Sequence, residues 1–153
     1  MVEDTDLGWD KLVKDLRSVM GYEVAAGLFD SSGVADPETN IAYRGYVNEY
    51  GIPQGDAKIP PRPFTREAWD NNQAEMKELE KKLVGRVIDG KTTPDQYFKI
   101  IGEFWKSKIK ASITSGNWKP NAKMTIELKG SSKPLIDTGE MLRNVDYKIR
   151  KAE

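Results

Sequence analysis

The sequence predicts an α+β protein, with an antiparallel pair of long helices, shorter helices and a small sheet. Three observations lead to this fold class. Long stretches in the middle of the chain repeat apolar residues every three or four positions, as amphipathic helices do. Two short segments, 22–29 and 145–150, have the length and composition of strands. Four Trp, six Tyr and four Phe supply enough large apolar surface for a core.

The residue totals favour one domain, 1–153, and argue against several functions. Lys plus Arg equals Asp plus Glu at 24 each, so no overall field attracts nucleic acid or an anionic membrane. The chain has no Cys and no His, which removes thiolate nucleophiles, imidazole bases and the usual zinc ligands. We therefore expect no metal and no cofactor. We also expect no secretory signal and no membrane span, because no apolar run approaches roughly 18 residues.

The first predicted helix covers residues 9–20. Its apolar residues recur at steps of three and four, which places them in one stripe. They are Trp9, Leu12, Val13, Leu16, Val19 and Met20. The acidic segment 3–6 suits the positive end of this helix, and Gly21 marks its end. Residues 22–29 follow as a strand, bounded by a turn-rich segment.

A short helix is predicted from about Glu38 to Tyr50, with Gly51 placed to end it. Tyr43, Tyr46 and Tyr50 lie within eight residues of one another. They could stack on nucleic acid bases. Packing of these rings into the core or into an interface is the favoured interpretation.

The segment 52–65 is predicted to be a rigid connector. It contains Pro53, Pro60, Pro61 and Pro63. Proline lacks a backbone donor and restricts the residue before it, so Arg62 cannot easily adopt helical geometry. Its side chain is presented from a stiff backbone, which suits an ion pair at the edge of the core or a contact with a neighbour.

Two long helices follow the connector. Thr65 is predicted to cap the first, 66–89, and Gly90 to end it. Its expected apolar face is Trp69, Met76, Leu79, Leu83, Val84, Val87 and Ile88. The second covers 97–115 with Phe98, Ile101, Trp105, Ile109 and Ile113 on one side. Because about four residues join them, the two helices should be antiparallel.

The strongest local pattern precedes the second long helix. Thr93 is placed as its N-cap, Pro94 as its first helical residue, and Gln96 as the partner that closes a capping box. Gly116 ends this helix. Residues 122–129 fit either a short helix or a strand, and 145–150 alternates as a half-buried strand.

Asp137-Thr138-Gly139 supports two interpretations. It is the local motif of an aspartic peptidase, in which two such loops supply a pair of carboxylates. It also fits a helix start, with Asp137 as N-cap and Glu140 closing a capping box. A peptidase lobe is nearly all strand and continues well beyond its loop, whereas only fourteen residues follow Gly139 and the upstream chain is largely helical. We therefore expect Asp137-Thr138-Gly139 to have a structural role as a helix start, and we expect no enzymatic activity.

Three motifs occur in order along the chain. They are Asn48-Glu49-Tyr50-Gly51, then Ile59-Pro60-Pro61-Arg62-Pro63-Phe64, then Lys133-Pro134-Leu135-Ile136-Asp137-Thr138-Gly139-Glu140-Met141. In this order and at these spacings, the chain from about 38 to 150 resembles a family of tailed-bacteriophage neck proteins. Members of that family are called virion morphogenesis, tail completion or head–tail joining proteins. Asn144-Val145 departs from the hydrophobic or Ser-Ile pair that the family often has after its last helix.

The resemblance implies a small, mostly antiparallel sheet packed by the two long helices. It implies a structural virion protein of the neck that joins or completes the tail as part of a homo-oligomeric ring. The partners would be further copies of the chain and other neck, connector or tail proteins, with passive contact to genomic DNA in the channel and none to a membrane. The location would be the virion, and the host cytoplasm during assembly.

A tail terminator ring, which caps polymerisation of the tail tube or sheath, is the alternative role. The resemblance implies no catalytic residue. The motif positions expected to serve structure or an interface are Asn48, Glu49, Gly51, Pro60, Arg62, Pro63, Phe64, Pro134, Leu135, Asp137, Thr138 and Gly139.

Overall fold

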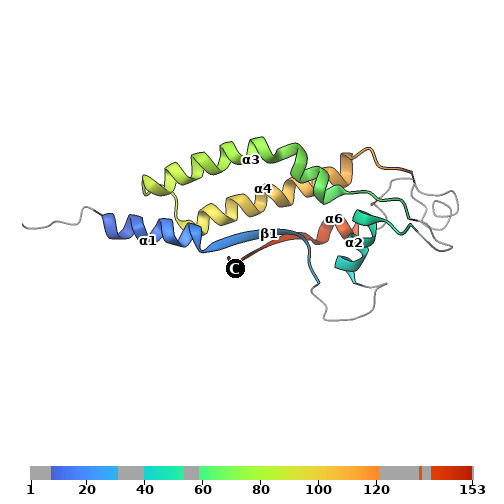
Figure 1. Cartoon of the computed structure of the whole chain (residues 1–153), viewed down its shortest axis with the longest axis horizontal. Helices are drawn as coiled ribbons and strands as arrows, with labels where there is room; N and C mark the ends of the chain where they lie inside the picture. Colours follow the sequence, from blue (N-terminus) through green and yellow to red (C-terminus); the bar gives the residue numbers. More distant parts are fainter. Residues whose placement is uncertain (1–7, 31–39, 54–58, 121–134, 136–138, 153) are drawn as a thin grey trace, which may run out of the picture.

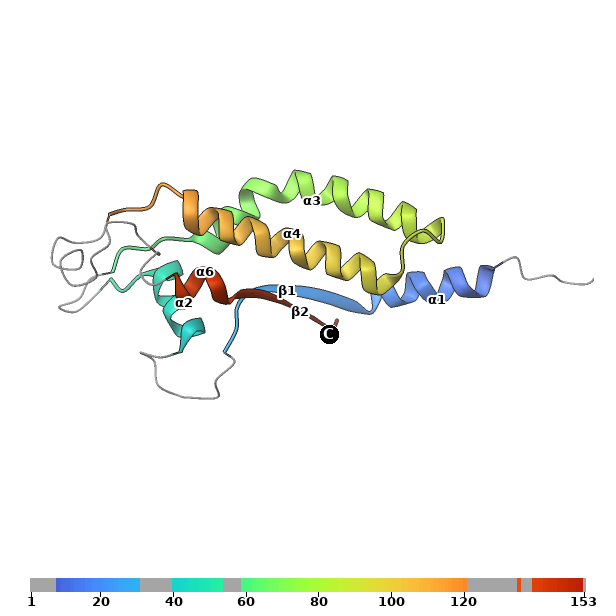
Figure 2. The same cartoon turned by 180° about the vertical axis from the view of Figure 1, so that it is seen from behind.

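The computed structural model of the chain describes residues 8–30, 40–53, 59–120, 135 and 139–152. Its elements in chain order are α1 (Trp9–Met20), β1 (Tyr22–Leu28), α2 (Ile41–Tyr50), α3 (Phe64–Ile88), α4 (Pro94–Ser115), α6 (Glu140–Asn144) and β2 (Val145–Lys151). Helices α3 and α4 lie side by side, and the sheet runs along α4 (Figures 1 and 2). The predicted α+β fold class is confirmed.

The antiparallel helix pair begins and ends close to the predicted residues. At the start of α4, the Thr93 hydroxyl accepts from the Gln96 amide at 3.3 Å, and the Gln96 side chain accepts from the Thr93 amide at 3.0 Å. This reciprocal arrangement is the predicted capping box, with Pro94 at the first helical position. Gly90, with φ of 68°, carries the chain out of α3. Local chemistry therefore determines the turn between the two helices.

The start of α3 differs from the prediction. The helix begins at Phe64, and Thr65 is its second residue instead of its N-cap. The residue in the N-cap position is Pro63, which makes no side-chain capping bond. Helix α2 also begins later than predicted, at Ile41, where the Asn40 side chain accepts from the Tyr43 amide at 3.0 Å. The acidic segment 3–6, proposed as the cap of α1, lies outside the described residues.

The sheet consists of β1 and β2, paired antiparallel in a register that runs from Tyr22 opposite Lys151 to Leu28 opposite Val145. Because side chains alternate along a strand, one face of the sheet packs on the helices. Gly102 of α4 lies against the Tyr147 ring, where a Cβ would overlap ring atoms. A glycine is needed for this close approach of the sheet to α4.

Two clusters of buried apolar residues form the core. One lies near the start of α3 and contains Ile41, Phe64, Ala68, Ile109, Ile113, Met141 and Val145. The other lies along the helix pair and contains Met76, Leu83, Val87, Tyr97, Phe98, Ile101 and Trp105. The predicted inner face of α4 is confirmed, because it contributes to both clusters. Trp69 was expected in the core but is 53% exposed, and it stacks on Trp105 with ring centroids 4.7 Å apart.

The final helix does not begin as predicted. Helix α6 starts at Glu140, directly after Gly139, whose φ is 74°. Asp137, the expected N-cap, lies outside the described residues. The Glu140 carboxylate accepts from Arg44 at 2.5 Å, which joins α6 to α2. The segment 122–129 also lies outside the described residues. None of the described helices could span a membrane.

Candidate functional site

The first two sequence motifs meet where α2 ends and α3 begins. Asn48, Glu49 and Gly51 come from the end of α2, and Arg62 and Phe64 come from the connector and the first turn of α3. We call this region the motif junction. It lies at the opposite end of the molecule from α1, beside α6 (Figures 1 and 2).

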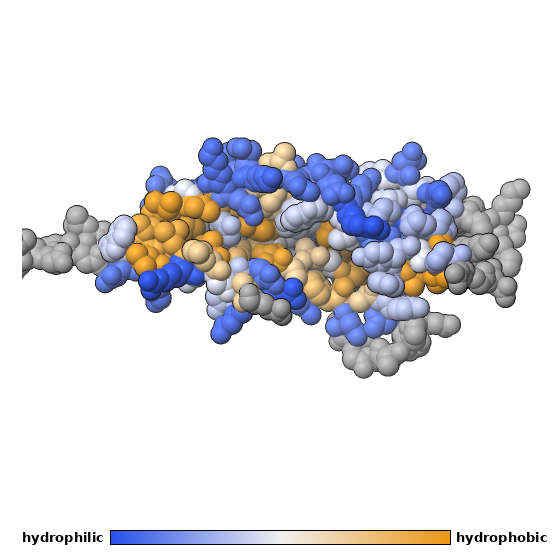
Figure 3. Space-filling view, in the orientation of Figure 1, coloured by the Kyte–Doolittle hydropathy of each residue, from blue (hydrophilic) through white to orange (hydrophobic). Residues whose placement is uncertain are grey.

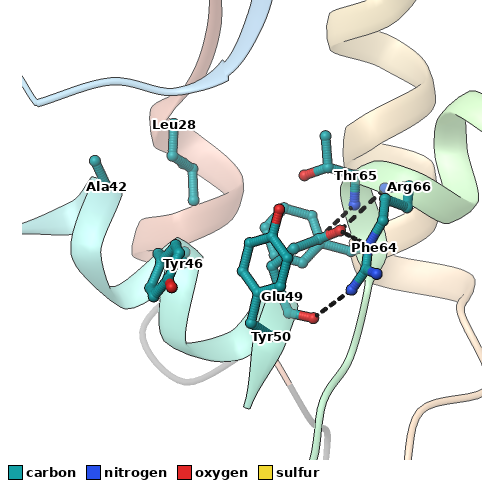
Figure 4. A pocket seen from close by; sticks show the side chains of 9 residues that line it. Leu28, Ala42, Tyr46, Glu49, Tyr50, Phe64, Thr65 and Arg66 are labelled. Carbon is teal, nitrogen blue, oxygen red and sulfur yellow. Dashed lines mark hydrogen bonds and ion pairs between the residues drawn. The ribbon is translucent and has the colours of Figure 1, made fainter. Parts of the chain in front are cut away.

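Glu49 caps α3 from another helix. Its two carboxylate oxygens accept from the backbone amides of Thr65 and Arg66 at 2.9 and 3.2 Å. The Arg66 side chain completes the contact, donating to the Glu49 carboxylate at 3.0 Å and to its carbonyl at 3.1 Å (Figure 4). The first amides of a helix have no partner within that helix, and they carry partial positive charge. Glu49, only 6% exposed, therefore supplies the cap that Pro63 cannot.

Asn48 joins the first motif to the second through Arg62. The Asn48 carbonyl accepts from the Arg62 amide at 2.7 Å, and the Asn48 side chain accepts from the guanidinium at 3.4 Å. The guanidinium also donates to the Lys119 carbonyl at 3.1 Å. Arg62 is 4% exposed, and this burial lowers the pKa of its guanidinium from the ordinary value. The partners described for the Arg62 guanidinium are thus a backbone and an amide oxygen, and the ion pair expected of it stays a prediction.

Gly51 lets the connector return against α2. Its φ is 73°, and a Cβ there would lie 2.6 Å from the Ile59 carbonyl oxygen and 2.8 Å from the Pro61 nitrogen. Beside it, Ile52 and Ile59 exchange two backbone hydrogen bonds of 2.9 and 3.1 Å. The glycine of the first motif is therefore required both by its backbone conformation and by the closeness of the second motif.

Part of the third motif reaches the same region. Arg44 donates to Glu140 at 2.5 Å, and the Asn48 side-chain amide donates to the Arg44 carbonyl at 2.8 Å and to the Met141 sulfur at 3.9 Å. Leu135 packs against the cluster of buried residues near the start of α3. Pro134, Asp137 and Thr138 lie outside the described residues. The peptidase interpretation of Asp137 therefore stays untested.

A hollow of about 250 Å³ opens above the Glu49 cap. It is lined by Leu28, Ala42, Gly45, Tyr46, Glu49, Tyr50, Phe64, Thr65 and Arg66 (Figure 4). The rings of Tyr46 and Tyr50 are 4.9 Å apart, and the Arg66 guanidinium lies 4.9 Å from the centre of the Tyr50 ring. These three side chains give the hollow an aromatic and cationic rim.

The tyrosines of α2 do not pack into the core. Tyr43, Tyr46 and Tyr50 are 45, 61 and 55% exposed. Packing into the core is therefore wrong for these rings, whereas an interface and stacking on nucleic acid both stay predictions. Tyr and Arg are enriched where proteins contact one another, because each combines a large apolar area with a polar group. The rim of the hollow therefore has the composition of a recognition surface.

The described contacts of the motif junction hold α2, the connector and α3 together. Among the described residues, no group of three Asp or Glu side chains could hold a metal ion. Each buried side-chain nitrogen or oxygen in that part of the chain has a hydrogen-bond partner. Sequence reasoning missed Arg44 and Arg66, which hold Glu140 and Glu49. No local pattern identifies these pairs, because their members belong to different helices.

Comparison of the chain with protein-family models, with curated proteins and with solved structures finds no match. The assignment of a function therefore depends on the three motifs and on the geometry that joins them.

Proposed function

We propose that this protein is a structural protein of a bacteriophage neck, which joins or completes the tail as one subunit of a homo-oligomeric ring. The observation that supports the proposal is the meeting of the motifs at one junction. Glu49 caps α3, Asn48 holds Arg62, and Glu140 and Met141 of the third motif contact α2. Motifs distant in sequence form a single structural unit, as is expected if they define a fold shared by a family.

The exposed rim of the junction supports the oligomeric part of the proposal. Tyr46, Tyr50 and Arg66 lie together on the surface, next to a hollow that can receive a side chain from a neighbour. Arg66 is held in place by its hydrogen bonds to Glu49, so this side chain loses little conformational freedom on binding. In the proposal, each subunit of the ring contacts the next through this rim.

The first test is the mass and shape of the purified protein. We expect light scattering to give a mass of several subunits, and negative-stain images to show rings, either alone or after addition of tail or portal proteins. Tyr46→Ala should shift the mass toward that of one subunit. The matched control is Ile100→Ala, which removes an exposed apolar side chain, 40% accessible, from α4. A monomer under all these conditions would refute the proposal.

The second test separates a joining protein from a tail terminator. In a phage that encodes this chain, loss of a joining protein should leave filled heads and tails of normal length that are not attached. Loss of a terminator should instead give tails of abnormal length. Electron micrographs of the defective lysate distinguish the two outcomes, and normal infectious particles would contradict both roles.

A further inference from the structure

Helix α1 carries an apolar seam that the described residues cover only on one side. Trp9, Val13, Leu16 and Met20 are four, three and four residues apart, the spacing of the seam of a two-helix coiled coil. Leu12 and Val19 flank the seam on one side, and Val19 packs against the core cluster along the helix pair. Asp10 and Arg17 flank it on the other side, and both are exposed.

The seam is open to solvent at its two ends, and Val13 and Leu16 between them are half-buried. Trp9 is 68% exposed and Met20 is 82% exposed, and no residue of α1 is fully buried. Apolar surface gathers at this end of the molecule, which also carries the exposed side chain of Ile88 at the end of α3 (Figure 3). An exposed apolar stripe of this kind marks an interaction surface in a protein whose outside is otherwise highly charged.

The position of α1 leaves room for a partner helix. The helix reaches beyond the end of the α3–α4 hairpin, so part of its length lies clear of the body of the molecule (Figures 1 and 2). Beside the seam is a hollow of about 480 Å³, lined by Asp10, Val13, Lys14, Arg17, Ser18 and Tyr22. A second helix laid along the seam can place its side chains in this hollow.

The charged residues beside the seam indicate which partner helix binds there. If two copies of α1 pack antiparallel about a two-fold axis between Lys14 and Asp15, Trp9 faces Met20 of the second copy and Val13 faces Leu16. Asp10 then lies next to Arg17 of the second copy, and the symmetry repeats this pair of opposite charges. In a parallel pair, Arg17 would instead face Leu12 and have no charge complement.

We propose that α1 is a self-docking element, which pairs antiparallel with α1 of a second copy of this chain. The pairing buries the Trp9–Met20 contacts, in which a thioether lies against an aromatic ring, and it is oriented by two Asp10–Arg17 ion pairs. The bodies of the two copies then extend to opposite sides. The inference goes beyond the proposed ring, because it concerns a different surface at the other end of the molecule, and it does not depend on a role in phage.

Engineered cysteines test the orientation directly, because the chain contains no other Cys. Trp9→Cys mixed with Met20→Cys should give a disulfide dimer under mild oxidation, whereas Trp9→Cys alone should not. In the antiparallel pair, position 9 of one copy and position 9 of the other are separated by about 16 Å along the helix, which is too far for a disulfide. Efficient dimerisation of Trp9→Cys alone, or none in the mixture, would overturn the proposal.

Charge reversal tests the same contact without altering the seam. Asp10→Arg and Arg17→Asp should each weaken self-association about tenfold in sedimentation measurements, since each single change opposes like charges twice. The double variant should recover most of the loss. Lys11→Asp makes the same change in charge as Arg17→Asp, but on the side of α1 opposite the seam, where the Lys11 side chain is 70% exposed, and it should have little effect. Equal weakening by Lys11→Asp, or no recovery in the double variant, contradicts the proposal.

The readouts also separate this contact from the proposed ring. Tyr46→Ala removes the ring contact and leaves the mixed-cysteine disulfide intact if both proposals hold. Arg17→Asp weakens the α1 pairing and leaves the mass of a single ring unchanged. A disulfide dimer in a protein that forms no ring would support the pairing and refute only the ring.

Discussion

Glu49 shows how one side chain can determine the start of a helix distant from it in sequence. Its carboxylate accepts from the Thr65 and Arg66 amides and from the Arg66 side chain, while it is 6% exposed. The proline at the N-cap position of α3 leaves these amides without a local acceptor. Helix α3 is therefore stabilised where α2 ends, and the angle between the two helices is fixed by hydrogen bonds.

Replacement of Glu49 tests this dependence. Glu49→Gln keeps the size of the side chain, but it turns one acceptor oxygen into a donor that faces backbone N–H groups. We expect a loss of about 2 kcal/mol in the free energy of unfolding, measured by urea denaturation. The control is Glu75→Gln within α3, where the carboxylate accepts from Lys108 at 2.6 Å and its side chain is 60% exposed. A surface pair of this kind contributes less than about 1 kcal/mol.

Replacement of two glycines by alanine should change the stability of the fold in opposite directions. Gly51→Ala places a Cβ against the Ile59 carbonyl in a left-handed backbone conformation, and we expect a loss of about 2 kcal/mol or more. Gly85→Ala in α3 places a Cβ where no atom lies within 4 Å, and we expect a gain of about 0.5–1 kcal/mol. Thermal unfolding of both variants measures the difference. If the two substitutions changed stability equally, the close contact between Gly51 and the connector would not be the cause.

Among the elements, those with local determinants could be predicted from the sequence. Both ends of α4 follow from Thr93, Pro94, Gln96 and Gly116, which lie next to the residues they control. The strand β2 also follows from its alternation, and its register is the one that places Val145 in the core. The cap of α3 could not be predicted, because its acceptor belongs to another helix.

At the motif junction, too, the contacts between distant elements could not be predicted from the sequence. Four residues that the sequence motifs contain, Asn48, Glu49, Gly51 and Arg62, lie at the contact of two motifs. It did not indicate what they bind, because each contact crosses from one element to another. The exposure of the α2 tyrosines could not be predicted either, since an aromatic stripe on a short helix suits the core as well as an interface.

Loss of the capping box should weaken α4 without changing its packing. Thr93→Ala removes the hydroxyl that accepts from the Gln96 amide, and we expect a loss of about 1 kcal/mol in stability. Thr93→Ser retains the hydroxyl and should recover most of this loss. Urea denaturation of the two variants checks the prediction, and identical losses would mean that the hydroxyl is not responsible.

An ion pair between β2 and α4 should make stability depend on pH in acid. The Lys106 ammonium donates to Asp146 at 2.9 Å, and this hydrogen bond holds the pKa of Asp146 below its ordinary value. A carboxylate with a lowered native pKa stabilises the fold above its unfolded pKa, and that contribution is lost as the pH falls through the native pKa.

We therefore expect Asp146→Asn to lower the melting temperature slightly at neutral pH, with the difference from the unchanged protein disappearing in acid. The effect should be small because the Asp146 side chain is 62% exposed. Melting curves over a pH series measure it. In a Lys106→Met background, Asp146→Asn should have a smaller effect at neutral pH. An undiminished effect would show that Lys106 is not the cause.

At the scale of the whole molecule, stability should be distributed unevenly. Helix α4 contributes buried residues to both core clusters, whereas α1 contains no buried residue. Local opening is easiest where few apolar contacts are lost. We expect hydrogen exchange to be slowest for amides in the middle of α4 and fast throughout α1. Exchange in α1 should slow as protein concentration rises if the proposed pairing forms, and it should not change in the Asp10→Arg variant.

The register of the sheet also has a consequence during translation. Tyr22 pairs with Lys151, so β1 leaves the ribosome long before its partner strand exists. Helices α3 and α4 can form their hairpin in the interval, because the contacts between them are close in sequence. Until β2 emerges, one edge of β1 lacks the hydrogen bonds that the finished sheet supplies, and unpaired strand edges invite aggregation. The nascent chain therefore carries an unpaired strand edge from the emergence of β1 until β2 is made.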